Sequence, residues 1–184
     1  MKKLEIVGFK RANLGKKESK DLRAEANIPA VLYGGANQVH FYAPAILFRD
    51  LLFTPDAYEV TLNIEGDIYR AILQDTQFHP VNDSLLHADF LEITDKPIKV
   101  NVPLKFVGNS PGVQKGGKLV QKLRKITLRG AAENIPDAVE VNISHLDLGK
   151  SVRVSEVKVE NVEILNALAL PIATIDIPRS LRGK

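Results

Sequence analysis

Alternating apolar and polar residues recur along this chain and predict that it folds mainly as β-strands. Residues 60–64 alternate, a Gly-Asp pair at 66–67 supplies a turn, and a second strand pattern follows over 68–73. This arrangement predicts a β-hairpin. The apolar residues 28–33 predict a further strand, which runs into two glycines after Tyr33.

Helical periodicity is confined to two short segments. Residues 44–53 place apolar side chains at helical spacing, and Thr54-Pro55 ends the pattern, so we expect a short amphipathic helix there. Residues 16–26 are the second helix candidate. Because Leu22 is the only large apolar residue of that basic segment, contacts outside the helix must help to hold it.

The second half of the chain continues the strand pattern. Its alternating segments are 98–102, 104–107, 118–128, 139–143, 152–159 and 170–177. The prolines expected at the ends of these runs, where a missing backbone donor is tolerated, are Pro103, Pro111, Pro136, Pro171 and Pro178. The predicted fold class is therefore mainly β, with a domain at 1–91 that carries two short helices, a boundary near 92–97 and an all-β domain at 98–184.

Composition narrows the class of protein without identifying it. The chain has 45% hydrophobic and 26% charged residues, as ordinary globular proteins do. It has no apolar run near the roughly 20 residues that span a bilayer, and charges interrupt the N-terminus where a signal peptide would be apolar. A cytosolic location is expected. The absence of cysteine excludes disulfides and thiolate chemistry.

Charge is distributed unevenly along the chain. Residues 1–35 hold eight Lys or Arg against four acids, residues 36–91 hold two against eight, and residues 92–184 hold fifteen against ten. The net charges of these parts are +4, −6 and +5. Two interpretations remain open at this point: basic ends that face a polyanion, or charged surfaces that keep the protein soluble.

Two motifs with possible chemistry are weak. Residues 112–118 fit the first seven positions of a phosphate-binding P-loop, but Leu119 replaces the Ser or Thr that holds magnesium, and the following residues have strand character. A glycine-rich loop between strands is the favoured interpretation. His79 and His87 lie near aspartates without a recognised zinc spacing, so imidazoles that bond strand ends or RNA are favoured. We expect no metal, no cofactor, no catalytic residue and no enzyme activity.

A third set of residues is typical of RNA binding. Arginine and lysine neutralise phosphates, while Tyr, His, Gln and Asp can stack on bases or bond sugars and base edges in a shallow minor groove. The candidates are Arg11, Lys16, Lys20, Arg23, Tyr33, Gln74, His87 and Asp89. They form one surface only if the fold brings the basic helix beside the strands of residues 74 and 87. The alternative is a solvated basic helix with polar strand ends.

The order of several motifs resembles a known family. These motifs are Gly15-Lys16, residues 28–34, Gln74-Asp75, His79-Pro80, residues 87–90, residues 102–113 and residues 143–149. Together they resemble bacterial large-subunit ribosomal protein number twenty-five, the general stress protein Ctc family, in its long form. The resemblance implies a small N-terminal β-barrel that binds 5S rRNA, and a C-terminal β domain with further contacts to rRNA or ribosomal proteins.

The resemblance also implies site residues. It adds Ser19 to Arg11, Lys16, Lys20 and Arg23 at the RNA backbone, and it assigns Tyr33, Gln74, His87 and Asp89 to the groove contact. Glu18 and Asp21 depart from the family pattern by placing two acids among the cations of the helix, so we do not expect the helix alone to bind tightly. Phe78 stands where some family members have an arginine, and it can stack instead of pairing with a phosphate. We expect help from a basic run and a basic tail. The run is Lys115, Lys118, Lys122, Arg124, Lys125 and Arg129, with a solvated strand face as the alternative, and the tail is Arg179, Arg182 and Lys184. A β-rich protein-binding adaptor outside the ribosome remains the alternative function.

Overall fold

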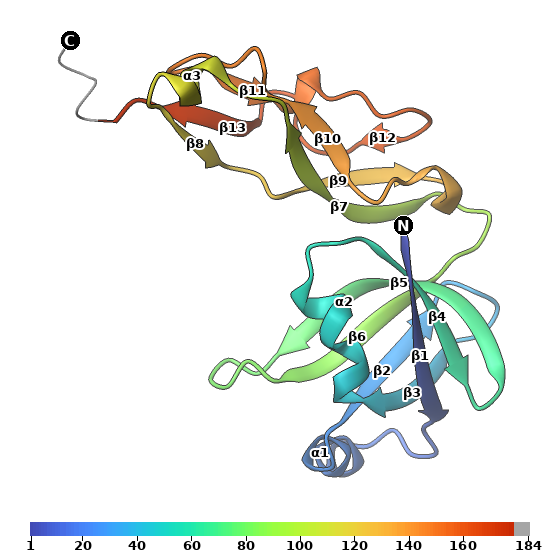
Figure 1. The fold of residues 1–184 in the computed structure, drawn as a ribbon. Helices are drawn as coiled ribbons and strands as arrows, with labels where there is room; N and C mark the ends of the chain where they lie inside the picture. The colour runs from blue at the N-terminus through green and yellow to red at the C-terminus, as the bar shows by residue number, and fades with distance from the viewer. Residues whose placement is uncertain (179–184) are drawn as a thin grey trace. The chain divides into compact units, whose positions relative to one another are not determined.

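The computed structural model describes residues 1–178 and divides the chain into two compact units, Met1–Ile98 and Lys99–Lys184 (Figure 1). The predicted basic tail lies outside the described residues. Both units consist mainly of strands with short helical turns, so the predicted fold class is confirmed.

The first unit is a closed six-stranded barrel in the order β1-β3-β2-β6-β5-β4. The strands are β1 (Lys2–Lys10), β2 (Asn27–Tyr33), β3 (Val39–Pro44), β4 (Tyr58–Ile64), β5 (Asp67–Phe78) and β6 (Leu85–Glu92). Parallel pairing of β1 with β4, from Lys2↔Tyr58 to Gly8↔Ile64, closes the barrel and leaves it without a free edge. The barrel that the resemblance implied is thus present.

Alternation along the strands fills the barrel interior. Phe41 and Phe90 are fully buried, with ring centroids 5.9 Å apart, and Phe48 lies 6.2 Å from Phe90. Phe41 also explains a glycine on β1, because a Cβ at Gly8 would lie 2.8 Å from its ring. The interior is therefore a packed aromatic and aliphatic core.

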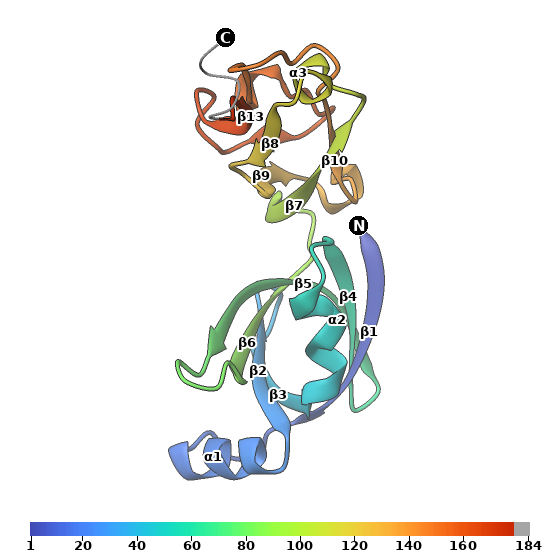
Figure 2. The same cartoon turned by 60° about the vertical axis from the view of Figure 1, so that its left-hand side comes forward.

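The predicted amphipathic helix forms as a 3₁₀ turn, η1 (Ala45–Phe48), that continues into α2 (Arg49–Phe53). Its buried side chains, Phe48 and Leu51, belong to the barrel core. Figure 2 shows this segment beside the strands of the barrel, and α1 (Lys16–Ala24) near the start of β2. Both predicted helices are confirmed.

The predicted hairpin is also confirmed. β4 and β5 pair from Val60↔Ala71 to Ile64↔Asp67, and Glu65 and Gly66 both take positive φ in the turn. β5 extends beyond the predicted strand to Phe78. β1 and β3 were not predicted.

The second unit contains two sheets, in the orders β10-β7-β9-β12 and β11-β13-β8. The strands are β7 (Ile98–Val107), β8 (Lys118–Gln121), β9 (Lys125–Gly130), β10 (Val139–Asn142), β11 (Ser151–Arg153), β12 (Glu163–Ile164) and β13 (Pro171–Asp176). Short turns separate them: α3 (Pro111–Gln114), η2 (Ala132–Asn134) and η3 (Val154–Glu156). Buried residues from both sheets, among them Val102, Ile126 and Ile172, supply the apolar core.

Three expectations for this unit were wrong. The segment 118–128 is two strands, because the N–H groups of Lys122 and Leu123 both donate to the carbonyl of Ile172 and interrupt the strand pairing. The predicted strand 152–159 ends at Arg153, and η3 begins at Val154. Pro103 lies inside β7 and is buried, so 98–102 and 104–107 are one strand rather than two.

Candidate nucleic-acid interface

α1 presents its lysines to solvent. Leu22 is buried, whereas Lys16, Lys17 and Lys20 are exposed. Lys16 and Lys20 are four residues apart and share one side of the helix. Glu18 is half-buried, and its Oε2 atom has no hydrogen-bond partner among the described residues. Of the two acids of this helix, Asp21 is therefore the one that lies exposed near the lysines.

Arg11 and Ser19 fasten this helix to the barrel. The Arg11 Nη2 donates to Ser19 Oγ at 3.0 Å, and Ser19 Oγ donates in turn to the Gly15 carbonyl at 2.9 Å. The Arg11 backbone N–H donates to the His40 carbonyl. Both side chains thus position the first turn of α1, in addition to any contact they make with a ligand.

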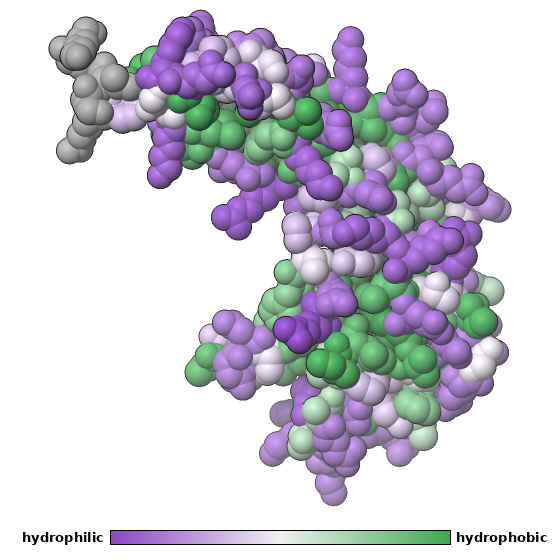
Figure 3. Space-filling model, in the orientation of Figure 1, coloured by the Kyte–Doolittle hydropathy of each residue, from purple (hydrophilic) through white to green (hydrophobic). Residues whose placement is uncertain are grey.

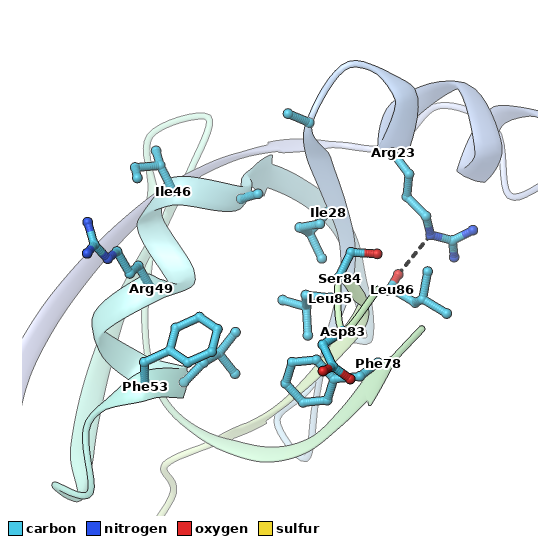
Figure 4. Close-up of a pocket in the computed structure, with 13 residues that line it drawn as sticks. Arg23, Ile28, Ile46, Arg49, Phe53, Phe78, Asp83, Ser84, Leu85 and Leu86 are labelled. Carbon is cyan, nitrogen blue, oxygen red and sulfur yellow. Dashed lines mark hydrogen bonds between the residues drawn. The ribbon is translucent and has the colours of Figure 1, made fainter. Parts of the chain in front are cut away.

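Arg23 fastens the other end of the helix. Its Nε donates to the Leu86 carbonyl at 3.0 Å, which joins α1 to β6 (Figure 4). A groove of about 520 Å³ lies beside this bond. Ile46 and Phe53 line one wall of the groove, and Phe78 lines the other (Figure 4). These three side chains are 68%, 75% and 42% exposed.

The groove belongs to a hydrophobic face of the first unit. Hydrophobic side chains gather over α2 in the space-filling view (Figure 3). Phe78 contributes to this apolar surface and lies next to Gln77 on β5.

Polar side chains meet on the outer face of β2, β6 and β5. Ala88 and Phe90 are fully buried inside the barrel, so the alternate residues His87 and Asp89 face outward. The His87 Nδ1 and Asp89 Oδ1 atoms are 2.7 Å apart. Burial raises the pKa of the Tyr33 hydroxyl, and the nearby carboxylates of Asp89 and Asp75 raise it further. The fold therefore brings Tyr33, His87 and Asp89 together.

Gln74 occupies a β-bulge next to this face. Pairing passes from Leu73↔Phe90 directly to Asp75↔Asp89, so Gln74 is the extra residue of β5. The same shift places Asp75 opposite Asp89 and Gln77 opposite His87.

Sequence reasoning missed three residues of this surface, namely Lys17, Asp75 and Gln77. Lys17 was discoverable as a further exposed lysine of the predicted helix. The positions of Asp75 and Gln77 depend on the bulge at Gln74, which no sequence pattern predicted.

The other two motifs have structural explanations. Residues 112–118 form a helical turn followed by β8, not a loop that leads into a helix. A Cβ at Gly112 would lie 2.7 Å from the Asp147 backbone, so this glycine allows the turn to pack closely against that backbone. Lys115 pairs with Asp147 at 2.8 Å. The P-loop interpretation is therefore wrong.

His79 closes the loop between β5 and β6. Its backbone N–H donates to the Ser84 carbonyl, and its Nδ1 accepts from the Val81 N–H at 3.3 Å. Within residues 1–178, no cluster of three or more His, Cys, Asp or Glu side chains has a geometry that could hold a metal ion. In the same residues, no helix is both long and apolar enough to cross a membrane.

Both units of the chain match models of ribosomal proteins. The model of the ribosomal L25p family matches residues 6–90, and the model of the C-terminal domain of ribosomal protein TL5 matches residues 97–179. Both matches are to ribosomal proteins, so the chain resembles structural proteins of the ribosome and is not an enzyme.

The relatives define the family. The large ribosomal subunit protein bL25 of Cytophaga hutchinsonii is 52% identical over 183 residues, which cover 99% of this chain and 95% of the relative. That of Amoebophilus asiaticus is 52% identical over 100% of this chain and 94% of the relative. That of Porphyromonas gingivalis is 39% identical over 100% and 97%. The chain belongs to the ribosomal L25p family, as the sequence motifs indicated.

Proposed function

We propose that this protein is a cytoplasmic, ribosome-associated component of the large ribosomal subunit that binds 5S rRNA through its barrel. The observation that carries the proposal is the position of α1, with its exposed lysines, on a barrel whose outer face presents Tyr33, His87 and Asp89. Family membership supplies the ribosomal context.

The two parts of this surface have different chemistry. The amines of Lys16, Lys17 and Lys20 neutralise phosphates and supply affinity without reading sequence. The strand face carries acceptors, because the carboxylates of Asp75 and Asp89 repel phosphates but accept hydrogen bonds from 2′-hydroxyl and base amino groups. Such groups are displayed in the wide minor groove of RNA. The strand face therefore supplies selectivity for RNA shape.

Arg11, Ser19 and Arg23 serve this interface in a second way. Their hydrogen bonds to α1 and β6 hold the helix in place. We assign these three residues to holding the helix in position as well as to contact with the RNA backbone. We assign Gln74 to the edge of the contact with the RNA minor groove. The C-terminal unit makes further contacts with rRNA or ribosomal proteins in this proposal.

One observation favours the alternative of a protein-binding adaptor. The apolar groove with Ile46, Phe53 and Phe78 is more suited to a protein segment than to phosphates. Binding to 5S rRNA separates the two functions, because an adaptor outside the ribosome has no preference for this RNA.

The test is binding of the full chain to 5S rRNA and to an unrelated RNA hairpin across a salt series. Lys16→Ala/Lys20→Ala should weaken binding and flatten the dependence of log K on log salt by about one per lost phosphate contact. Lys96→Ala, which removes an exposed lysine of the same unit, is the control. An unchanged salt slope in the double variant would remove α1 from the interface, and the absence of any 5S preference in the unmodified chain would favour the adaptor.

A further inference from the structure

A second group of cations lies on one sheet of the C-terminal unit. Lys125 and Arg129 are exposed on β9, and Lys99 is exposed on β7, the neighbouring strand. These residues are far apart in the sequence. The basic run expected between 115 and 129 is divided by the fold, because Lys115 is paired with Asp147 and Lys118 lies on β8 in the other sheet.

Two hydrogen bonds fix how β7 and β9 face one another. Thr127 Oγ1 donates to Asn101 Oδ1 at 2.8 Å, and the Leu104 N–H donates to the Arg124 carbonyl at 3.0 Å. The strands therefore run in opposite directions, with Asn101 beside Thr127. Side chains two residues apart share a face, so Lys99 lies on the face of Asn101, and Lys125 and Arg129 lie on the face of Thr127. All three cations thus share one face.

Two acids on the flanking strands partly neutralise this face, and one of them, Glu140 of β10, is in register with Lys105 of β7. Glu163 on β12 is opposite Arg129, at 3.9 Å between carboxylate and guanidinium, and both side chains are more than half exposed. Such an exposed pair is weak. Lys99 and Lys125 have no ion-pair partner among residues 1–178.

The spacing suits a polyanion. Lys125 and Arg129 are four positions apart along the strand, about 13 Å, which allows the two cations to meet different phosphates of one backbone. The Asn101 side-chain N–H groups lie between the charges and can donate to sugar or phosphate oxygens, and Thr127 Oγ1 can accept from a 2′-hydroxyl.

We propose that the exposed face of β7 and β9 binds the phosphate backbone of an RNA segment separate from the one bound by the barrel. This inference rests on the proposed function, since it assumes that the protein works on the large ribosomal subunit. It assigns to RNA, rather than to a neighbouring protein, the face made by Lys99, Lys125 and Arg129.

The test compares two double variants of the full chain. Lys99→Gln/Lys125→Gln removes two charges from the proposed face, and Lys150→Gln/Lys158→Gln removes two exposed lysines of the same unit outside it. Affinity for purified large subunits depleted of this protein, and for free 5S rRNA, is measured across a salt series. For the first variant, the slope of log K against log salt should be smaller by about two on subunits. On 5S rRNA the slope should equal that of the unmodified chain. The control variant should match the unmodified chain on both.

The outcomes separate the two proposals. If the unmodified chain binds neither 5S rRNA nor subunits, the proposed function fails. The inference about β7 and β9 is overturned if the unmodified chain binds both and the two variants have the same salt slope on subunits, whether unchanged or equally reduced. The proposed function then stands.

A photoreactive amino acid in place of Thr127, in subunits assembled with the full chain, identifies the partner. Cross-links to rRNA support the inference, whereas cross-links to ribosomal protein alone, or none, overturn it. The same photoreactive residue in place of Lys158 is the matched position and should give no RNA product.

Discussion

Tyr33 is the residue through which we expect the strand face to select 5S rRNA over other RNA. It is half-buried beside Asp75 and Asp89, which together with burial raise the pKa of its phenol. The phenol is a hydrogen-bond donor at neutral pH, as that of any tyrosine is. Tyr33→Phe should lose this donor but keep the ring, and Tyr33→Ala should lose both.

We therefore expect discrimination between 5S rRNA and an unrelated hairpin to fall stepwise from Tyr to Phe to Ala, as measured by the ratio of the two dissociation constants. Equal losses of affinity on both RNAs would assign Tyr33 to the barrel core instead.

Glu59 links the stability of the barrel to pH. A hydrogen bond from Arg70 at 2.6 Å lowers the pKa of this carboxyl, and burial opposes the shift without cancelling it. A group with a lowered folded pKa stabilises the native state above its unfolded pKa, and this contribution is lost as pH falls through the folded pKa. Glu59→Gln should reduce stability at neutral pH and flatten its loss in acid.

Urea unfolding at a series of pH values measures this effect. Glu25→Gln, which changes an exposed carboxyl of the same unit, should leave the pH dependence unchanged. A parallel shift of the Glu59→Gln curve at all pH values would contradict the assignment to ionisation.

At the scale of an element, the segment of η1 and α2 has two different apolar sides. Phe48 is fully buried in the barrel core, whereas Phe53 is 75% exposed beside the groove. Phe48→Ala should lower the free energy of unfolding by about 3–5 kcal/mol, and Phe53→Ala should change it by less than about 0.5 kcal/mol. Chemical denaturation of the two variants provides the comparison, and similar losses would contradict the observed packing.

The elements that the sequence pattern predicted are those with local signals. The hairpin of β4 and β5 has a turn sequence between alternating runs, and the helices have periodicity or a stop at Thr54-Pro55. β1 gave no clear signal because Gly8 occupies an inward position that Phe41 fills from β3. Its place in the barrel depends on pairing with β4, some fifty residues away in sequence, which local reasoning does not reveal.

The candidate site also contains residues that a local sequence pattern predicts and residues that it does not. The lysines of α1 follow from the helical pattern of one segment. The partners on the strand face depend on register, and a single bulge at Gln74 decides that Asp75 and Gln77 lie opposite Asp89 and His87. Residue chemistry grouped the helix with this face only on condition that the fold joined them, and the resemblance to a family supported that condition.

At the scale of the whole molecule, strand contacts of the first unit continue past residue 91. The two compact units divide after Ile98, which is 3% exposed. Glu92 pairs with Ala71, and the Ile93 N–H donates to the Arg70 carbonyl. A fragment that stops at residue 91 therefore loses part of the β5 and β6 ladder, whereas a fragment of residues 1–98 keeps it.

We expect residues 1–98 to fold alone and to retain the preference for 5S rRNA, because the barrel closes within this unit and holds its own core. Residues 1–91 should show a lower midpoint in thermal unfolding followed by circular dichroism. If the longer fragment unfolds cooperatively but binds both RNAs equally, selectivity requires the second unit. If it does not fold, the two units depend on each other, and the division of labour between a selective barrel and a backbone-binding C-terminal sheet would have to be abandoned.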